Sequence, residues 1–476
     1  MSISKRIDIS FWVVTGLTLL YVLLPSSNNT LDSVAYSLDI RSGNHLFYPH
    51  HLLFNAFGFV LSKLFSINNT LLFICLVNSI FAGGCLFIMR RLLLSFTDNK
   101  TCAVILLFLG SCYGFMRFAT DAETYIIPLF FALWGSKVIF YEEKIIPTSL
   151  LLSISCLFHQ LFVFWWIGLW VYIWWNLENN RLKNSIKYIS VAFIVPVVYF
   201  IVFRFTEHDC SNLLEFVFHD YIKFSSVSVS FNSTIFLLTP VSFIRTFVQV
   251  HGYILPLLQK YILLLIPVAI ACICFFIGLY KLKGSISKKS PTQQVNKYAF
   301  SHLIIFAVQF LFAAISDGNA EFMLMLPFAL AIYFFGKFTI KLSPVLFFSI
   351  GIFLWNLSLA LIPIHYIQTG IDESMVEYIN KHPDRIYFLP ENNRTGLLLE
   401  YYSPDKEYKI YNFKVELDSL IQTGNTIYTN AVNNTFFMSR GSILSNNAKL
   451  FSNYNINKID SINYSLGTMY ISIVKE

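Results

Sequence analysis

Carboxylate side chains recur in the polar connections between the long apolar segments of this chain. The first connection, LDSVAYSLDIRSGNHLFYPHH, holds Asp32 and, seven residues later, Asp39. A second connection, FMRFATDAETY, holds Asp121 and Glu123, and the segment ISDGNAEFMLMLP holds Glu321. A positioned carboxylate can take the proton of a hydroxyl group while the oxygen forms a new bond, which is general-base catalysis. These connections are therefore the first places to look for acid–base chemistry.

Arginines near the same connections could bind an anion. Arg117 precedes Asp121 by four residues, Arg204 lies at the end of an apolar segment, and Arg245 lies in the long connection 205–252. The planar guanidinium group can donate two parallel hydrogen bonds to a phosphate, a geometry that lysine cannot match. The i,i+4 spacing of Arg117 and Asp121 also fits a structural ion pair on one helix face, so both interpretations stay open.

Three histidines complete the set of residues that could line a site. His50 and His51 follow a Tyr-Pro turn, and His159 lies between two apolar stretches in CLFHQLFVFWW. We expect no metal site, because neither an HxxxH nor an HExxH spacing occurs. A divalent cation held by His45, His50 and nearby carboxylates therefore has no support from the spacing.

The composition indicates what must position these side chains. Of the 476 residues, 56% are hydrophobic and only 13% are charged, and the mean hydropathy is +0.60. A soluble core of this size could not bury so much apolar surface, so much of it must face lipid. The net charge of +7 does not indicate nucleic-acid binding, because the Lys and Arg residues are spread between apolar segments without forming a basic face. Seven of the eight cysteines fall inside apolar stretches, and we expect neither a disulfide nor a cysteine metal site.

The apolar segments predict an all-α bundle of about eleven transmembrane helices, since a crossing takes about 20 apolar residues. The two short segments on either side of His159 form a pair that resembles a re-entrant loop. The predicted segments centre near residues 11–26, 70–89, 101–117, 125–142, 146–160, 161–176, 187–204, 254–280, 298–315, 321–336 and 343–364.

Basic residues predict how these segments are oriented, because Lys and Arg accumulate in short cytoplasmic loops. Starting from Lys5 and Arg6, every second connection is basic. The basic connections hold Arg90 and Arg91; Lys144; Arg181, Lys183 and Lys187; Lys281, Lys283, Lys288 and Lys289; and Lys337 and Lys341. The alternation predicts that all the carboxylates and arginines singled out above, and the chain after residue 366, lie on the non-cytoplasmic side.

The end of the chain has a different character, which predicts two domains: a transmembrane module over 1–366 and a soluble α/β domain over 367–476. In the second range, charge and Asn content rise and no 20-residue apolar run remains. Short strand-like segments (RIYFLP, YKIYNF, NTIYTN, TMYISIV) are separated by helix-like ones (ESMVEYINK, VELDSLIQ). We expect this domain on the outer face, where it supports the membrane part or helps to bind an acceptor.

The first connection carries the strongest resemblance to a known family. An acidic residue just after the first apolar segment, followed by a His/Pro-rich turn and a short interfacial helix, resembles the GT-C superfamily of polyprenyl-phosphate-sugar-dependent glycosyltransferases, and protein O-mannosyltransferase-like members in particular. The residues that carry the likeness are Asp32-Ser33, the HLFYPHHLLFNAFG turn, the segment from Asp121 to Tyr125, His159 and the EFMLMLPFALAI segment. Compared with many relatives, the second acid of the first loop is displaced to Asp39, and Glu321 stands where a basic residue is common.

This resemblance implies a reaction, namely transfer of a sugar from a polyprenyl-phosphate donor to an acceptor hydroxyl at the outer face. We expect Asp32 to be the catalytic base, although it could instead cap a loop helix. Donor binding would use a phosphate clamp, and further carboxylates and histidines would line the site. The clamp candidates are Arg117, Arg204 and Arg245; the site carboxylates are Asp39, Asp121, Glu123 and Glu321; the histidines are His50, His51 and His159. No cofactor is required, because the donor sugar is already activated.

Two other functions remain open from the sequence. A lipid-linked polysaccharide polymerase or ligase would also use a lipid-linked donor, and long outer loops rich in His and Arg favour it. A transporter is the non-enzymatic alternative, but its ionisable groups are expected near the bilayer midplane, whereas here they lie at segment ends. The expected partners are the lipid donor, a protein, lipid or glycan acceptor and the bilayer, with no nucleic acid. We expect a bacterial inner membrane location, with the active site and C-terminus in the periplasm.

Overall fold

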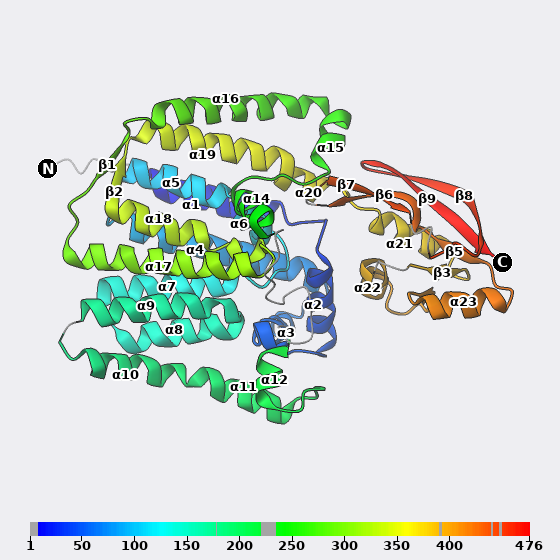
Figure 1. Cartoon of the computed structure of the whole chain (residues 1–476), viewed down its shortest axis with the longest axis horizontal. Helices are drawn as coiled ribbons and strands as arrows, with labels where there is room; N and C mark the ends of the chain where they lie inside the picture. The colour runs from blue at the N-terminus through cyan, green and yellow to red at the C-terminus, as the bar shows by residue number, and fades with distance from the viewer. Residues whose placement is uncertain (1–7, 178, 220–234, 390–392, 439–440, 447–449) are drawn as a thin grey trace. The chain divides into compact units, whose positions relative to one another are not determined.

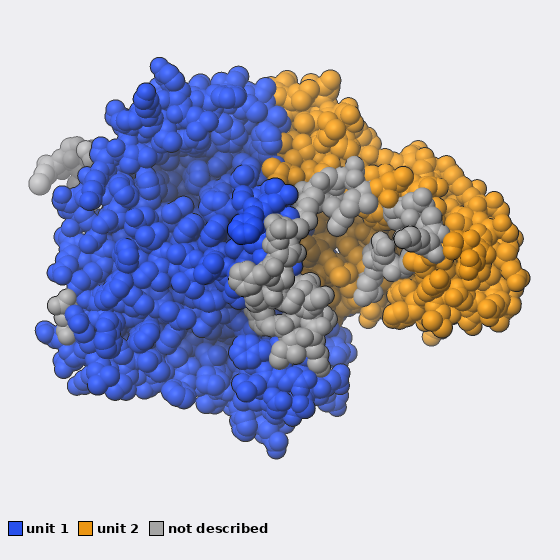
Figure 2. All heavy atoms as spheres, in the orientation of Figure 1, with its two compact units in different colours: residues 1–25, 39–249, 267–357 blue, residues 26–38, 250–266, 358–476 orange. Residues whose placement is uncertain are grey.

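The computed structural model describes residues 8–177, 179–219, 235–389, 393–438, 441–446 and 450–476. The chain folds into two compact units, coloured blue and orange in Figure 2. Unit 1 comprises residues 1–25, 39–249 and 267–357, and unit 2 comprises residues 26–38, 250–266 and 358–476. Unit 2 therefore contains the predicted C-terminal domain together with two short earlier segments.

Unit 1 is helical, and its helices run side by side along one direction (Figure 1). Within it α1 packs on α4 and α5, α4 on α7, α7 on α8, α9 on α17, and α17 on α18. The longer helices are α1 (Ile9–Leu23), α4 (Thr70–Leu93), α5 (Asn99–Ser111), α7 (Ile126–Glu142), α8 (Ile145–Phe158), α9 (Val163–Asn176), α10 (Arg181–Ala192), α11 (Ile194–Phe205), α14 (Ile235–Phe247), α16 (Leu265–Leu282), α17 (Gln293–Ile315), α18 (Leu326–Lys337) and α19 (Leu342–Asn356). The shorter elements are η1 (Pro49–His51), α3 (Phe54–Leu64), α6 (Tyr113–Ala119), η2 (Gln160–Phe162), α12 (Leu213–Val217), β1 (Ile286–Lys288), η4 (Glu321–Met323) and β2 (Phe338–Ile340).

These helices make the chain an integral membrane protein. In the part of the chain that the structure describes, five continuous helical stretches are long and apolar enough to cross a bilayer. The pair α5 and α6, bent by 70°, makes a sixth if the two form one span. The five stretches are Thr70–Leu93, Arg181–Phe205, Ile262–Leu282, Gln293–Ile315 and Leu342–Tyr366. Each of the eleven predicted segments coincides with a helix or a run of helices, but several of these are short: α1 has 15 residues and α8 has 14. A bundle that is mostly helical is confirmed, and the count of eleven crossings stays a prediction.

The two ends of unit 1 differ in composition. The β1–β2 ribbon and the turn between α9 and α10 lie at one end, whereas α3, α6 and α14 lie at the other (Figure 1). Lys289, which follows β1, donates hydrogen bonds to the carbonyls of Phe96 and Phe335, so the end of α4 belongs to the ribbon end. The predicted basic connections of unit 1 thus gather at one end, and the predicted site residues of unit 1 gather at the other (Figure 1). Lys5 and Arg6 lie outside the described residues, and which end faces the cytoplasm stays a prediction.

Unit 2 contains a five-stranded mixed sheet in the order β4-β3-β5-β9-β8. The central strand β5 is parallel to β3 and antiparallel to β9. Buried Phe388, Leu417, Ile427, Phe451 and Val474 form its core. The elements are α15 (Ile254–Lys260), η3 (Ile262–Leu264), the π-helical turn η5 (Leu357–Leu361), α20 (Ile362–Tyr366), α21 (Asp372–Lys381), β3 (Ile386–Phe388), α22 (Asn393–Tyr402), β4 (Lys409–Tyr411), α23 (Lys414–Gln422), β5 (Ile427–Thr429), β6 (Val432–Met438), β7 (Gly441–Asn446), β8 (Asn455–Tyr464) and β9 (Gly467–Lys475).

The sheet lies where the sequence predicts strands. The segments RIYFLP, YKIYNF, NTIYTN and TMYISIV hold β3, β4, β5 and β9, and α21 and α23 lie on the two predicted helices. The strand β8 was not predicted, because its sequence NINKIDSINY is polar and most of its side chains are exposed. A small sheet is therefore present, and a boundary at residue 367 and a position on the outer face stay predictions.

Candidate active site

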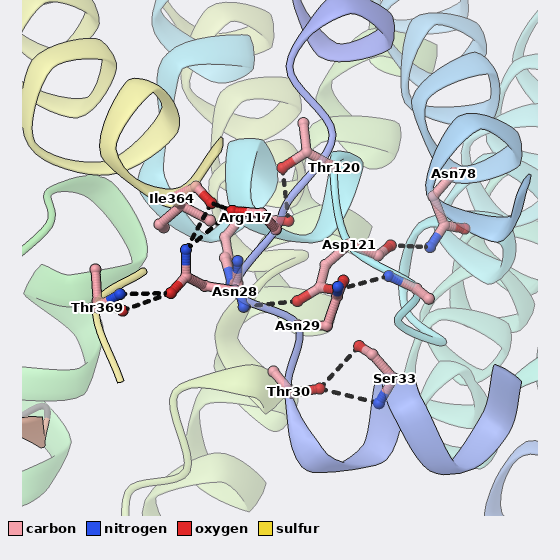
Figure 3. A network of polar contacts seen from close by, with 12 residues as sticks. Asn28, Asn29, Thr30, Ser33, Asn78, Arg117, Thr120, Asp121, Ile364 and Thr369 are labelled. Atoms are coloured by element: carbon pink, nitrogen blue, oxygen red, sulfur yellow. Dashed lines mark hydrogen bonds and ion pairs between the residues drawn. The ribbon is translucent and has the colours of Figure 1, made fainter. Parts of the chain in front are cut away.

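The connection between α6 and α7 is held in place by a buried side chain of α4. Asn78, which is fully buried, donates hydrogen bonds of 2.7 Å to the backbone carbonyls of both Asp121 and Glu123. An amide in an otherwise apolar helix can satisfy two carbonyls that would be costly to bury alone. Asn78 therefore fixes the backbone that carries two predicted site carboxylates (Figure 3).

Arg117 and Asp121 form an ion pair of 2.6 Å, with the Asp121 side chain fully buried and that of Arg117 13% exposed. The remaining oxygen of Asp121 accepts a hydrogen bond from the backbone N–H of Ala122 at 2.9 Å. The i,i+4 pair that the spacing allowed is thus present. A fully buried carboxylate needs its cation, so part of the Arg117 guanidinium is committed to structure.

Glu321 is joined to the same connection by Tyr125. The Tyr125 hydroxyl donates a hydrogen bond of 3.0 Å to Glu321 Oε2. The backbone around Glu321 is itself positioned, because Asn319 Oδ1 accepts from its N–H and Gln309 on α17 donates to the carbonyl of Phe322. A tyrosine for which no role was predicted therefore links two of the predicted carboxylate segments.

Tyr125 also connects the carboxylates to the histidines. Its ring stacks on that of His159, with the ring centroids 4.7 Å apart. The His159 centroid lies 6.1 Å from that of His50, and the His50 centroid lies 4.1 Å from that of His51. His159 lies at the break between α8 and α9, where its Nδ1 accepts from the N–H of Leu161. Burial, reinforced by His50 and His159, lowers the pKa of His51 well below its usual value, so His51 is neutral at pH 7. The three predicted histidines are thus one cluster.

Asp39 has hydrogen-bond donors of its own. The helix α2 (Leu31–Ser42) carries Asp39 near its end, and the Tyr48 hydroxyl donates to Asp39 Oδ2 at 3.0 Å. Asn55, fully buried on α3, lies 3.4 Å from the same oxygen. Of these two hydrogen bonds to the half-buried Asp39 carboxylate, the one from the Tyr48 hydroxyl is the shorter.

The remaining predicted arginines differ from Arg117. Arg245 is half-buried in the last turn of α14, and its buried Nε has no hydrogen-bond partner among the described residues. The helix α14 packs on α6, which carries Arg117, and on η4, which begins at Glu321. Arg204 lies exposed in the last turn of α11. The structure therefore brings Arg245 to the elements that hold the other site residues.

Asp32 lies exposed in the first turn of α2, in the part of that helix that belongs to unit 2. The cap is a different residue: Thr30 Oγ1 accepts a hydrogen bond of 3.0 Å from the N–H of Ser33 (Figure 3). Because Thr30 supplies this N-terminal hydrogen bond, the alternative role of Asp32 as the cap of the helix is not needed.

The segment before Asp32 is tied to later parts of unit 2 by Asn28. Its side-chain N–H groups donate to the carbonyls of Ile364 and Ile367, both at 2.7 Å, and its oxygen accepts from the N–H and hydroxyl of Thr369 (Figure 3). The Arg394 Nε donates to the carbonyl of Asn29 at 2.9 Å. Residues more than 300 positions apart in sequence therefore hold the start of the first connection.

Sequence patterns pointed to part of this arrangement. Asn78 could have been noticed as a buried amide in the apolar run TLLFICLVNSIF, and Tyr125 stood within a segment already singled out. Nothing in the sequence pointed to Asn28 or Arg394, because their partners are distant. In the part of the chain that the structure describes, no group of three or more His, Cys, Asp or Glu side chains could hold a metal ion.

Comparison with known proteins shows which fold carries these residues. Neither protein-family models nor curated proteins match the sequence. A crystal structure of ArnT from Cupriavidus metallidurans bound to undecaprenyl phosphate is similar over 97% of both chains, with a TM-score of 0.55 and 10% sequence identity. This chain has the GT-C fold. A structure of the same ArnT in the apo state has the same identity and coverage with a TM-score of 0.43.

The resemblance to the GT-C superfamily that the first connection predicted is thus confirmed for the fold. The fold similarity extends over 97% of the chain, whereas the residues that carry the sequence resemblance end with the EFMLMLPFALAI segment. The closer likeness to protein O-mannosyltransferases, and the roles of the individual site residues, stay predictions.

Proposed function

We propose that this chain is a glycosyltransferase that moves a sugar from a polyprenyl-phosphate donor to an acceptor hydroxyl at the outer face of the membrane. The observation that carries the proposal is the GT-C fold, which it shares over 97% of its length with ArnT solved with undecaprenyl phosphate. A donor of this kind brings an activated sugar to the membrane surface. The enzyme then needs to supply only a base, an anion site and a bound acceptor.

Arg245 is the best candidate for the donor phosphate. Negative charge grows on the departing phosphate as the sugar leaves, and a preorganised cation there stabilises the transition state. Arg117 is the second member, although its ion pair with Asp121 leaves fewer N–H groups for a ligand. Arg204 is the weakest of the three predicted clamp residues because it is exposed.

Asp32 remains the proposed base. It is exposed, its helix start is capped by Thr30, and its preceding backbone is fixed by Asn28 and Arg394. Asp39 accepts a hydrogen bond from the Tyr48 hydroxyl, which orients this carboxylate as a candidate acceptor site. The carboxylates of Asp121, Glu123 and Glu321 would shape the site around the histidine cluster.

The proposal requires no cofactor, and it places the active site and the C-terminus in the periplasm of a bacterial inner membrane. The basic residues at the ribbon end of unit 1 support that orientation, because such residues stay in the cytoplasm. The sugar and the acceptor, whether protein, lipid or glycan, are left to experiment.

The decisive experiment compares two isosteric variants in the first connection. Asp32→Asn removes the proton acceptor while preserving size, so the transfer rate should fall on the order of 100- to 10,000-fold. Asp39→Asn is the matched control, seven residues along the same helix, and should retain far more activity. The assay is transfer of labelled sugar from a polyprenyl-phosphate donor in membranes that contain equal amounts of each variant.

The outcomes separate the alternatives. Full activity of Asp32→Asn would remove it as the base and move the assignment to Asp39 or Glu123. Transfer of preassembled glycans but not of single sugars would identify a polysaccharide polymerase or ligase. No transfer from any lipid-linked donor by the wild type, with a soluble solute moving across the membrane instead, would identify a transporter.

A further inference from the structure

A groove of about 690 Å³ runs between α4 and α7 in unit 1, away from the candidate active site. Its α4 side extends from Gly84 past the end of the helix to Ser95, and its α7 side extends from Phe130 to Tyr141. Several of its apolar side chains are open to the surroundings: Phe87 is 40% exposed and Trp134 is 39% exposed. Because α4 is a membrane-crossing helix, this groove faces lipid.

The groove is apolar at one end and cationic at the other. Gly84, Phe87, Phe130 and Trp134 line the apolar part. At Gly84 a side-chain carbon would lie 2.7 Å from the Phe130 ring, so glycine is what lets this aromatic ring approach α4. The lining therefore offers a surface for an alkyl chain.

The polar end is held by side chains of both helices. Arg91, Ser95, Lys137 and Tyr141 line it. The Tyr141 hydroxyl donates a hydrogen bond of 2.6 Å to the carbonyl of Arg91 and also contacts the Ser95 hydroxyl. These contacts join the ends of α4 and α7, so both helices present a cation at the same end of the groove.

The charge at this end is only weakly countered, because Glu142 attracts Lys137 without forming an ion pair with it. Among the residues that the structure describes, neither Arg91 nor Lys137 has an ion-pair partner within 4 Å, and Arg91 instead lies over the ring of Phe87 at 5.6 Å. Glu142, the nearest acid along α7, forms its ion pair with Lys144 at 2.8 Å. Two cations and two hydroxyl groups that line the same end of the groove are complementary to a phosphate.

The apolar part of the groove is shorter than one leaflet. From position 84 to position 91, and from 130 to 137, a helical rise of about 1.5 Å per residue gives roughly 10 Å. Half of the roughly 30 Å hydrocarbon core is about 15 Å. An alkyl chain whose headgroup lies at Arg91 and Lys137 would therefore contact this part over about two-thirds of its depth in the leaflet.

We propose that this groove is a binding site for an anionic phospholipid, with its phosphate between Arg91 and Lys137 and an acyl chain along Phe87, Phe130 and Trp134. The site lies at the ribbon end of the bundle, where basic pockets between transmembrane helices bind anionic headgroups of the cytoplasmic leaflet. The proposal is independent of the transferase activity and would hold for any function of the chain.

The test measures lipid retention by the purified full-length protein in native mass spectrometry, with phosphatidylglycerol and phosphatidylcholine of the same acyl chains as probes. Wild type should retain phosphatidylglycerol in preference to phosphatidylcholine. The Arg91→Gln/Lys137→Gln variant should lose about 30-fold in affinity for phosphatidylglycerol, at one lipid-phosphate interaction per cation. The control Lys183→Gln/Lys187→Gln removes the same charge from exposed positions of α10 and should change nothing.

A second measurement reports on the acyl chain. Phosphatidylglycerol with brominated acyl chains should quench tryptophan fluorescence in the wild type, and Trp134→Phe should remove part of that quenching while leaving headgroup selectivity intact. Equal retention of both phospholipids by the wild type, equal losses in the α10 control, or a loss of undecaprenyl phosphate retention without a loss of phosphatidylglycerol retention in Arg91→Gln/Lys137→Gln would each overturn the proposal.

Discussion

Arg394 in unit 2 and Arg245 in unit 1 show two ways of holding a guanidinium group away from bulk water. Arg394 donates to Asp372 at 2.8 Å, to Glu373, and through Nε to the carbonyl of Asn29, so all three of its nitrogens are engaged. Arg245 is half-buried, and its buried Nε has no partner among the residues described. All three nitrogens of Arg394 thus have partners in its own chain, whereas Arg245 Nε has none within the described part of the chain.

The difference indicates what each residue can do. Burial alone would lower the pKa of Arg394, but the carboxylates of Glu373 and Asp372 outweigh it and raise the pKa above its usual value. Each nitrogen of Arg394 is already engaged by its own chain, and one of its bonds holds the backbone that precedes Asp32. The Nε–H group of Arg245 can donate a hydrogen bond to a ligand. Its helix α14 packs on α6 and η4, which carry other site residues.

The largest effect is expected from breaking the saturated network. Arg394→Ala leaves Asp372 and Glu373, each 14% exposed, without their cation. Removing one partner from a largely buried ionic network typically costs about 3–5 kcal/mol of stability. We expect that loss in the free energy of unfolding of the part of the chain that contains the sheet, measured by denaturant titration in detergent.

The matched control for this prediction is Arg394→Met/Asp372→Asn/Glu373→Gln, which removes the whole network and leaves no buried charge. It should be more stable than Arg394→Ala. If Arg394→Ala unfolds as the wild type does, the network is not structural, and the contrast with Arg245 fails.

A smaller effect, of a different kind, is expected at Arg245. Arg245→Gln should leave thermal stability unchanged, because no carboxylate of the described chain depends on it, and should lower sugar transfer roughly 100- to 1,000-fold, the usual cost of one transition-state donor. Arg245→Lys should recover only part of the activity, since it keeps the charge but not the fork.

Arg204→Gln is the control for Arg245, because it removes the same charge from an exposed position on α11. It should change transfer less than about two-fold, which is the scale of an exposed charge acting through solvent. Equal losses in both variants would show that the overall positive field matters and that neither arginine is a specific clamp.

The smallest effect concerns His51, a buried group that is held neutral. Its pKa is lowered by burial and by His50 and His159, so below about pH 6.5 the unfolded chain takes up a proton that the folded chain refuses. This part of the stability is present above about pH 6.5 and is lost as the pH falls toward the folded pKa, by at most about 1.4 kcal/mol per pH unit.

Unfolding free energies of wild type and His51→Gln between about pH 7.5 and 5 test this prediction. The variant should have a shallower dependence on pH, because it carries one titratable group fewer. Parallel curves would mean that His51 is not the group that resists protonation.

The helical bundle was predictable because hydrophobic runs of about 20 residues have few solutions in a bilayer. The breaks in the helices were less predictable, because the 70° bend between α5 and α6 falls inside the single predicted segment 101–117. The four strands β3, β4, β5 and β9 were predicted from alternating apolar residues, whereas polar β8 carried no such signal. Composition and periodicity indicate which residues are buried. They therefore do not predict a strand whose side chains are mostly exposed.

The candidate site was predictable as a set of residue types. Charged groups near membrane depth are costly, so Asp39, Asp121 and Glu321 stood out from an apolar background. The sequence could not show that Tyr125 joins Glu321 to His159, because these three residues come from separate segments. It also could not rank Arg117, Arg204 and Arg245, which differ in their partners and not in their chemistry.

The sequence by itself determined that this chain is a membrane protein and which residues could act in catalysis or binding. It also determined that the first connection resembles that of a GT-C enzyme. Those properties follow from local composition and spacing. Only the tertiary structure decided that every nitrogen of Arg394 has a partner while Arg245 Nε has none among the described residues. It also decided that Asn78 and Asn28 hold the backbones of Asp121 and of the segment before Asp32. The physical reason is that hydrogen-bond satisfaction depends on partners that are distant in the sequence, which no local pattern encodes.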